Sequence, residues 1–115
     1  MEEIININEV AMEVILHAGD GRMKIDEALE KMAIFDFEYA DKLLKEAKQE
    51  ILQAHNAQTK VIQAQVSGEQ FEYSLLFVHA QDTVMTITTE LRMVQKMEPI
   101  FKALYQRSKI GRAHV

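Results

Sequence analysis

Residues 37–66 read FEYADKLLKEAKQEILQAHNAQTKVIQAQV, and this stretch decides the fold. It contains no glycine or proline, and good helix formers dominate it. Its apolar seam advances by alternating steps of four and three residues, a heptad pattern that predicts one long helix. The seam consists of Ala40, Leu44, Ala47, Ile51, Ala54, Gln58, Val61 and Gln65. Gln58 is a polar residue in this seam, so it needs a hydrogen-bond partner if it is buried.

Two further helices flank this one, over about Asn6–Met32 and about Tyr73–Ser108. Asp36 is a good N-cap for the central helix, and residues 67–70 form the second turn. The first helix carries an apolar stripe of Ile7, Ala11, Val14, Ala18, Ile25, Leu29 and Met32. We therefore expect an all-α fold, a three-helix up-down-up bundle in a single domain over residues 1–109.

Three residues disturb the regular helix pattern. Gly19 and Gly21 lie inside the first helix, where each costs up to about 1 kcal/mol against alanine, so we expect close helix packing there. Pro99 lies inside the third helix and should bend or split it, because proline removes one backbone hydrogen bond. Residues 110–115, IGRAHV, can be back-translated into the start of a common sequencing adapter, so we expect this tail not to be native.

Composition excludes several classes of protein. The chain has 115 residues and no cysteine, which removes disulfides and thiolate catalysis and fits a reducing compartment. A net charge of −5 argues against a general nucleic-acid binder. The N-terminus shows no signal peptide. No apolar stretch approaches the ~18 residues that span a bilayer, so we expect no direct membrane insertion.

The third helix carries two apolar faces. Phe77, Val84, Ile87, Leu91 and Val94 gather on one side, which should pack on the other helices. A second stripe lies nearly opposite and consists of Leu75, Val78, Asp82, Met85, Thr89 and Met93. A small three-helix domain needs one apolar stripe on each helix, so the second stripe predicts a homo-oligomer. The alternative is that this helix is the central, most buried helix of a monomer.

Asp82 lies in the middle of the second stripe. A buried carboxylate needs a proton, a cationic partner or a metal. Around a symmetry axis Asp82 would meet its own copies, and their repulsion would be relieved by a divalent cation such as Mg²⁺. The alternative is a solvated aspartate at the rim of the stripe.

His79 is the leading candidate for chemistry. Imidazole is largely neutral near pH 7, so one ring nitrogen has a free lone pair and can act as a nucleophile. A group carried on His79 would lean toward the start of its helix, where free amides and the positive end of the dipole favour phosphate. The alternative is a structural or merely exposed histidine. His55 and His17 are better explained as structural or surface residues.

The segment 74–86, SLLFVHAQDTVMT, resembles the active-site segment of the enzyme IIA component of the sugar phosphotransferase system, lactose/cellobiose (chitobiose) type. Residues 17–22, HAGDGR, are similar to the first-helix pattern of this family. Asp36 and Phe37 followed by Ala40 resemble the start of its second helix. His55 with Gln58 and Thr59 matches a further signature, and the resemblance covers about residues 9–105.

The resemblance implies a homotrimer of three-helix subunits, a nine-helix bundle in the cytoplasm. It implies that His79 accepts a phosphoryl group from the carrier HPr and passes it to a cysteine of the IIB component during sugar uptake. It also implies that Asp82 lies near the trimer axis and can bind a divalent metal such as Mg²⁺. Gln81 and Gln58 are polar neighbours of the site in this interpretation.

Two positions depart from the family pattern. Many members carry a second histidine where this chain has Thr83, and members usually continue an ordinary helix where this chain has Pro99. Thr83 supports an alternative function, a non-catalytic interaction or regulatory module that keeps the helical bundle and has lost phosphoryl transfer.

Overall fold

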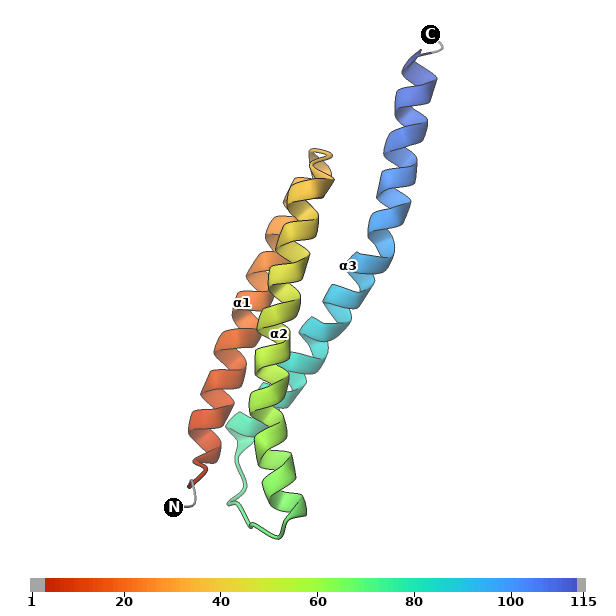
Figure 1. The fold of residues 1–115 in the computed structure, drawn as a ribbon. Helices are drawn as coiled ribbons and strands as arrows, with labels where there is room; N and C mark the ends of the chain where they lie inside the picture. The colour runs from red at the N-terminus through yellow and green to blue at the C-terminus, as the bar shows by residue number, and fades with distance from the viewer. Residues whose placement is uncertain (1–3, 114–115) are drawn as a thin grey trace.

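The computed structural model describes residues 4–113, which form three helices joined by two short connections (Figure 1). The helices are α1 (Ile7–Ala33), α2 (Phe37–Val66) and α3 (Leu75–Ala113). α1 and α3 run in the same direction and α2 runs antiparallel to both, which confirms the up-down-up bundle. Figure 1 shows an elongated molecule, with α3 extending past the α1–α2 turn. Residues 114 and 115 of the expected non-native tail lie outside the described residues.

Side chains cap the starts of α1 and α2. The Asn6 side chain accepts hydrogen bonds from the amides of Asn8 and Glu9, 3.1 and 3.2 Å away. Asp36 accepts from the amide of Tyr39 at 3.2 Å, which confirms it as the N-cap of α2. These bonds satisfy amides that a helix start would otherwise leave free.

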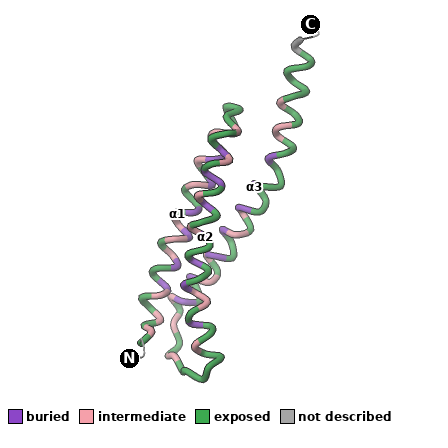
Figure 2. Tube along the Cα trace, in the orientation of Figure 1, coloured by how far each residue is buried: buried purple, intermediate pink, exposed green. Residues whose placement is uncertain are grey.

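The core follows the predicted seams with local shifts. In Figure 2 the buried residues line the inner sides of α1 and α2 and stop part-way along α3. The α2 seam is buried from Ala40 to Val61, but Gln65 is exposed and Gln58 is half-buried. In α1, Leu29 is 39% exposed and the neighbouring Ala28 is buried instead. The core face predicted for α3 is confirmed, because Phe77, Val84, Ile87, Leu91 and Val94 are all buried.

The two glycines of α1 behave differently. A Cβ on Gly21 would lie 3.1 Å from Cγ1 of Ile51 and 3.5 Å from the carbonyl oxygen of Ala47. This contact brings the backbones of α1 and α2 together, so close packing is confirmed at Gly21. A Cβ on Gly19 would meet nothing within 4 Å, so the same prediction is wrong there.

Pro99 bends α3 without splitting it. α3 is one continuous helix through Ala113, past the predicted end at Ser108. Figure 1 shows α3 changing direction near its middle, and beyond the bend Lys102 and Tyr105 still contact Asp41 and Phe35. A proline at position 99 leaves the carbonyl of Gln95 without its helical donor, which accounts for the bend.

Ion pairs of Lys102 join α3 to α2 near the bend. Nζ of Lys102 lies 3.5 Å from Oδ2 of Asp41 on α2 and 3.4 Å from Oε1 of Glu98. Glu98 is buried, and its Oε2 has no hydrogen-bond partner among the described residues. Burial, reinforced by Asp41 and opposed by Lys102, raises the pKa of Glu98. One helical turn further on, Tyr105 stacks on Phe35, with ring centroids 4.3 Å apart.

Candidate functional site

His79 is the fifth residue of α3, and Ser74 places the start of that helix. The Ser74 hydroxyl accepts a hydrogen bond from the amide of Phe77 at 3.0 Å and donates one to Oδ1 of Asn8 at 2.7 Å. These two bonds cap α3 and join its first turn to the first turn of α1. The position of His79 is thereby set by contacts of its own helix start.

The imidazole of His79 is exposed and makes no polar contact within the described residues. Among residues 4–113 no hydrogen bond or ion pair engages its ring nitrogens. The Thr83 hydroxyl donates to the backbone carbonyl of His79 at 2.8 Å, so it is directed at the backbone and not at the ring. A ring nitrogen of His79 therefore remains available to an incoming electrophile.

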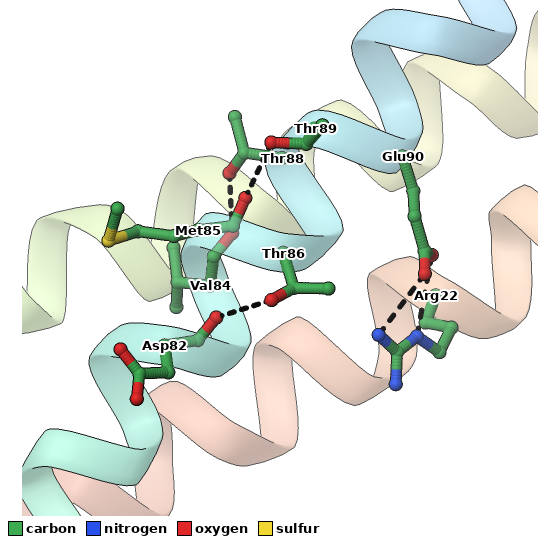
Figure 3. A network of polar contacts seen from close by, with 8 residues as sticks. All are labelled: Arg22, Asp82, Val84, Met85, Thr86, Thr88, Thr89 and Glu90. Carbon is green, nitrogen blue, oxygen red and sulfur yellow. Dashed lines mark hydrogen bonds and ion pairs between the residues drawn. The ribbon is translucent and has the colours of Figure 1, made fainter.

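Asp82 lies on an exposed apolar stripe, as the periodicity of α3 predicts. Met85 is 65% and Met93 52% exposed, and Val78 is also exposed. In Figure 3 the Asp82 carboxylate and the Met85 side chain point to the same side of α3, away from the ion pair between Arg22 and Glu90. In a single chain these apolar side chains remain exposed to solvent. An exposed apolar stripe of this kind is what the oligomer hypothesis predicts.

Gln81 does not lie beside His79 on α3. Gln81 follows His79 by two residues, roughly 200° around the helix, so it lies on the far flank of the stripe. Gln58 is half-buried on α2, and its Oε1 is buried without a hydrogen-bond partner among the described residues. Their assignment as neighbours of the site stays a prediction.

Sequence reasoning missed the ion pairs that brace α1. Arg22 contacts Glu90 of α3 with 3.2 Å between Nη2 and Oε1. His17, expected to be a surface or packing residue, lies 2.9 Å from Oε2 of Glu50 on α2. The partners are 68 and 33 residues apart in the chain, so no local spacing signalled them.

The outer face of α1 is apolar and acidic. Met12, Leu16 and Met23 are exposed there. Four carboxylates flank them on the same helix, from Glu9, Glu13, Asp20 and Glu27. The two basic side chains in the middle of α1, Arg22 and Lys24, are engaged by Glu90 and Glu46. Such a face suits a partner that carries apolar and basic side chains.

One chain alone does not form a metal site at Asp82. Within residues 4–113 no three His, Asp or Glu side chains lie close enough together to hold a metal ion. Asp82 supplies a single exposed carboxylate, whereas Mg²⁺ prefers octahedral oxygen coordination. A cation at this position would need carboxylates from several copies.

The sequence model of the lactose/cellobiose-specific IIA subunit of the phosphotransferase system matches residues 9–102. The chain belongs to this family. The match includes His79 and Asp82 and covers all of α2 and most of α1 and α3, so the resemblance is not confined to the segment 74–86. Within residues 4–113, none of the helices has the uninterrupted apolar length that a bilayer span requires.

Individual relatives agree with the family match. A lichenan-specific phosphotransferase enzyme IIA component from Bacillus subtilis is 34% identical over 101 residues, covering 88% of this chain and 92% of the relative. A lactose-specific IIA component from Staphylococcus epidermidis is 33% identical and covers 85% and 97%. The crystal structure of a cellobiose-specific enzyme IIA from Bacillus anthracis superposes with a TM-score of 0.83 at 30% identity, covering 90% of this chain and 95% of that one.

Proposed function

We propose that this IIA subunit is a phosphocarrier that works in the cytoplasm and accepts a phosphoryl group from HPr on His79. It then passes the group to the IIB component during uptake of a lactose-, cellobiose- or chitobiose-type sugar. The observation that carries this proposal is the free, exposed imidazole of His79 at the capped start of α3. The family match supplies the context, because a IIA subunit is a component of a phosphotransferase.

The transfer needs only one nucleophilic nitrogen from this chain and proceeds in two displacement steps. The lone pair of the His79 imidazole attacks phosphorus, a new N–P bond forms, and the N–P bond of the donor breaks with its electron pair returning to the donor ring. In the second step a thiolate of IIB attacks the same phosphorus and the His79 N–P bond breaks. Phosphoryl transfer depends mainly on positioning and on neutralising charge. The start of α3 favours the phosphoryl oxygens through the positive end of its helix dipole.

The outer face of α1 supports recognition of the carrier proteins. Its exposed Met12 and Leu16 offer an apolar contact, and the flanking Glu9 and Glu13 favour a basic partner surface. Because opposite charges also steer the encounter, transfer from HPr should slow as salt concentration rises.

Self-association completes the proposal. The exposed stripe of α3 would be covered by the same stripe of two further copies, as a homotrimer with nine helices. In that assembly Asp82 of each copy would face the axis, and a divalent cation such as Mg²⁺ would relieve the repulsion among the carboxylates. The support for this assembly is the exposed row of Val78, Met85 and Met93 around Asp82.

The direct test mixes the protein with phosphoenolpyruvate, enzyme I and HPr and then measures intact mass. The expected result is a gain of one phosphoryl group per chain, absent in His79→Ala and retained in a matched His55→Ala control. No gain in the wild type, or a gain that survives His79→Ala, would contradict the assignment.

The alternative function is a non-catalytic interaction or regulatory module that keeps the same helical-bundle fold. Thr83 supports it, since its hydroxyl is directed at a backbone carbonyl and offers no second imidazole beside His79. The same mass measurement separates the two functions, because a module that has lost transfer stays unmodified.

A further inference from the structure

A cavity of about 420 Å³ lies between the end of α1 and the part of α3 beyond the bend. Leu29, Met32 and Ala33 line it from α1, and Phe101, Leu104 and Tyr105 line it from α3. Glu98 is the last buried residue of α3 among those described, so no buried α3 side chain fills the space beyond it. Phe101 lies roughly 30 Å along α3 from His79, so the cavity is separate from the candidate phosphoryl site.

The walls of this cavity are almost entirely apolar. Among the lining residues, Ser108 and Tyr105 alone carry a side-chain hydroxyl. A water molecule in such a space lacks the about two to four polar partners that would hold it in place. An apolar body that displaces this water gains free energy, because apolar area leaves the solvent. The cavity therefore favours an apolar occupant.

Phe35 adopts an unusual backbone conformation that places its ring at the cavity. Its φ is 64°, in the left-handed region where a helix-ending turn favours glycine. The turn is closed by hydrogen bonds of 2.9 Å that the amides of Phe35 and Asp36 donate to carbonyls of the last turn of α1. The Phe35 ring stacks on Tyr105, and both rings line the cavity. A strained position that keeps a bulky side chain points to a role for that side chain, and here it forms an aromatic wall.

Lys109 places a positive charge at the rim of the cavity. Its Nζ lies 4.8 Å from the centroid of the Tyr105 ring. None of the ion pairs within residues 4–113 includes Lys109. The carboxylate of Asp36, next to Phe35 in the chain, accepts from the amide of Tyr39 at the start of α2. The rim therefore favours a ligand that carries a negative charge.

We propose that this cavity binds a small amphipathic anion, a carboxylate with an apolar body of about eight to ten carbon atoms. The body contacts the rings of Phe35 and Tyr105, and the carboxylate lies at the rim beside Lys109. Each helical wall spans only about one to two turns, which is too short for the apolar stripe of a partner helix. The proposal does not depend on phosphoryl transfer, because the cavity and the His79 segment lie far apart on α3.

The test is isothermal titration calorimetry of the full chain with octanoate, below the micelle concentration of octanoate. We expect one octanoate to bind per chain with a dissociation constant on the order of 10⁻⁴ to 10⁻³ M. Octanol has the same apolar body without the charge, and we expect it to bind more weakly. Circular dichroism and light scattering check that each variant keeps its helix content and its assembly.

Two variants test the apolar part of the site. Ala33→Phe adds a phenyl ring at the cavity wall and should lower the affinity for octanoate at least about tenfold, because the ring takes the space of the ligand. Ala103→Phe adds the same ring to an exposed position of α3 outside the cavity and should bind as wild type. Phe35→Gly suits the left-handed backbone but removes the aromatic wall, so it should weaken binding roughly two- to tenfold.

A second pair of variants tests the charge at the rim. Lys109→Gln should weaken octanoate binding roughly two- to fivefold, as for an exposed ion pair, and leave octanol binding unchanged. Lys60→Gln on the exposed side of α2 removes the same charge far from the cavity and should bind octanoate as wild type.

Four results would overturn the proposal. Wild type that shows no saturable binding of octanoate has no such site. Ala33→Phe that is folded and binds as tightly as wild type would place the ligand elsewhere. Several octanoates per chain, unaffected by any of the variants, would indicate adsorption on the outer stripe of α3. An assembly that dissociates as octanoate binds would show that a second copy of the chain occupies the cavity.

Discussion

The hydroxyl of Ser74 donates a hydrogen bond of 2.7 Å to Oδ1 of Asn8, which ties the start of α3 to the start of α1. The two residues are 66 positions apart in the chain. The same hydroxyl accepts from the amide of Phe77 and caps α3. One side chain therefore joins two helix starts directly before the segment that carries His79.

Ser74→Ala should lower the free energy of unfolding by about 1–2 kcal/mol, because it removes an N-cap and leaves Asn8 without its donor. It should also slow phosphoryl acceptance by His79. Ser74→Asp restores the cap and should recover most of the stability, but its negative charge near the helix start should not restore the rate. Urea unfolding and the rate of mass gain measure the two effects, and equal recovery of both would contradict the electrostatic part.

Gly21 and Gly19 provide a matched pair for helix packing. Gly21→Val should destabilise the protein by about 1–3 kcal/mol, because its side chain would press on Ile51 and the α2 backbone. Gly19→Ala should stabilise it by up to about 1 kcal/mol, since its Cβ meets open space and alanine favours helix. Thermal unfolding of the two variants against wild type tests both signs, and a stabilised Gly21→Val would show that the helices do not approach closely there.

Glu98 should make stability depend on pH in an unusual direction for a carboxylate. Burial is the main cause that raises its pKa above the ordinary 4.5. The folded state then binds the proton more tightly than the unfolded state. The stability that this group contributes is fully present below pH 4.5 and is lost as pH rises through the pKa of the folded state.

Glu98→Gln mimics the protonated form and should remove this dependence. Relative to the variant, the wild type should lose stability as pH rises from 4.5 to 7. Urea unfolding at several pH values measures the difference, with exposed Glu30→Gln as a control that should change stability by less than about 0.5 kcal/mol at each pH. A wild type that gains stability over this range relative to Glu98→Gln would mean that the contact with Lys102 outweighs burial.

Asp82→Leu should preserve or strengthen the assembly, because it removes clustered charge from the stripe and adds apolar surface. Light scattering of the variant and the wild type, with and without Mg²⁺, measures this. If Asp82→Leu dissociates to monomers, the carboxylate is needed as a metal ligand or hydrogen-bond partner, and the axial cation becomes the stronger interpretation.

Much of the fold could be predicted from local patterns. The α2 seam from Ala40 to Val61 and the capping role of Asp36 follow from residue spacing within single helices. Gln65 lies in the last turn of α2, where a neighbouring helix no longer covers the seam, whereas at Leu29 the buried side of α1 shifts to the adjacent Ala28. The pattern around His79 indicated the candidate site, because several motifs occur in the same order as in the family.

The sequence by itself determined the helices, their apolar faces and the residues that carry the candidate chemistry, because helix periodicity and capping act over a few residues. The tertiary structure alone decided which distant side chains meet, such as Ser74 with Asn8 and Lys102 with Asp41. It also decided that Gly21 and not Gly19 lies against α2. These outcomes depend on how the helices rotate and cross once packed, and no local pattern encodes that geometry.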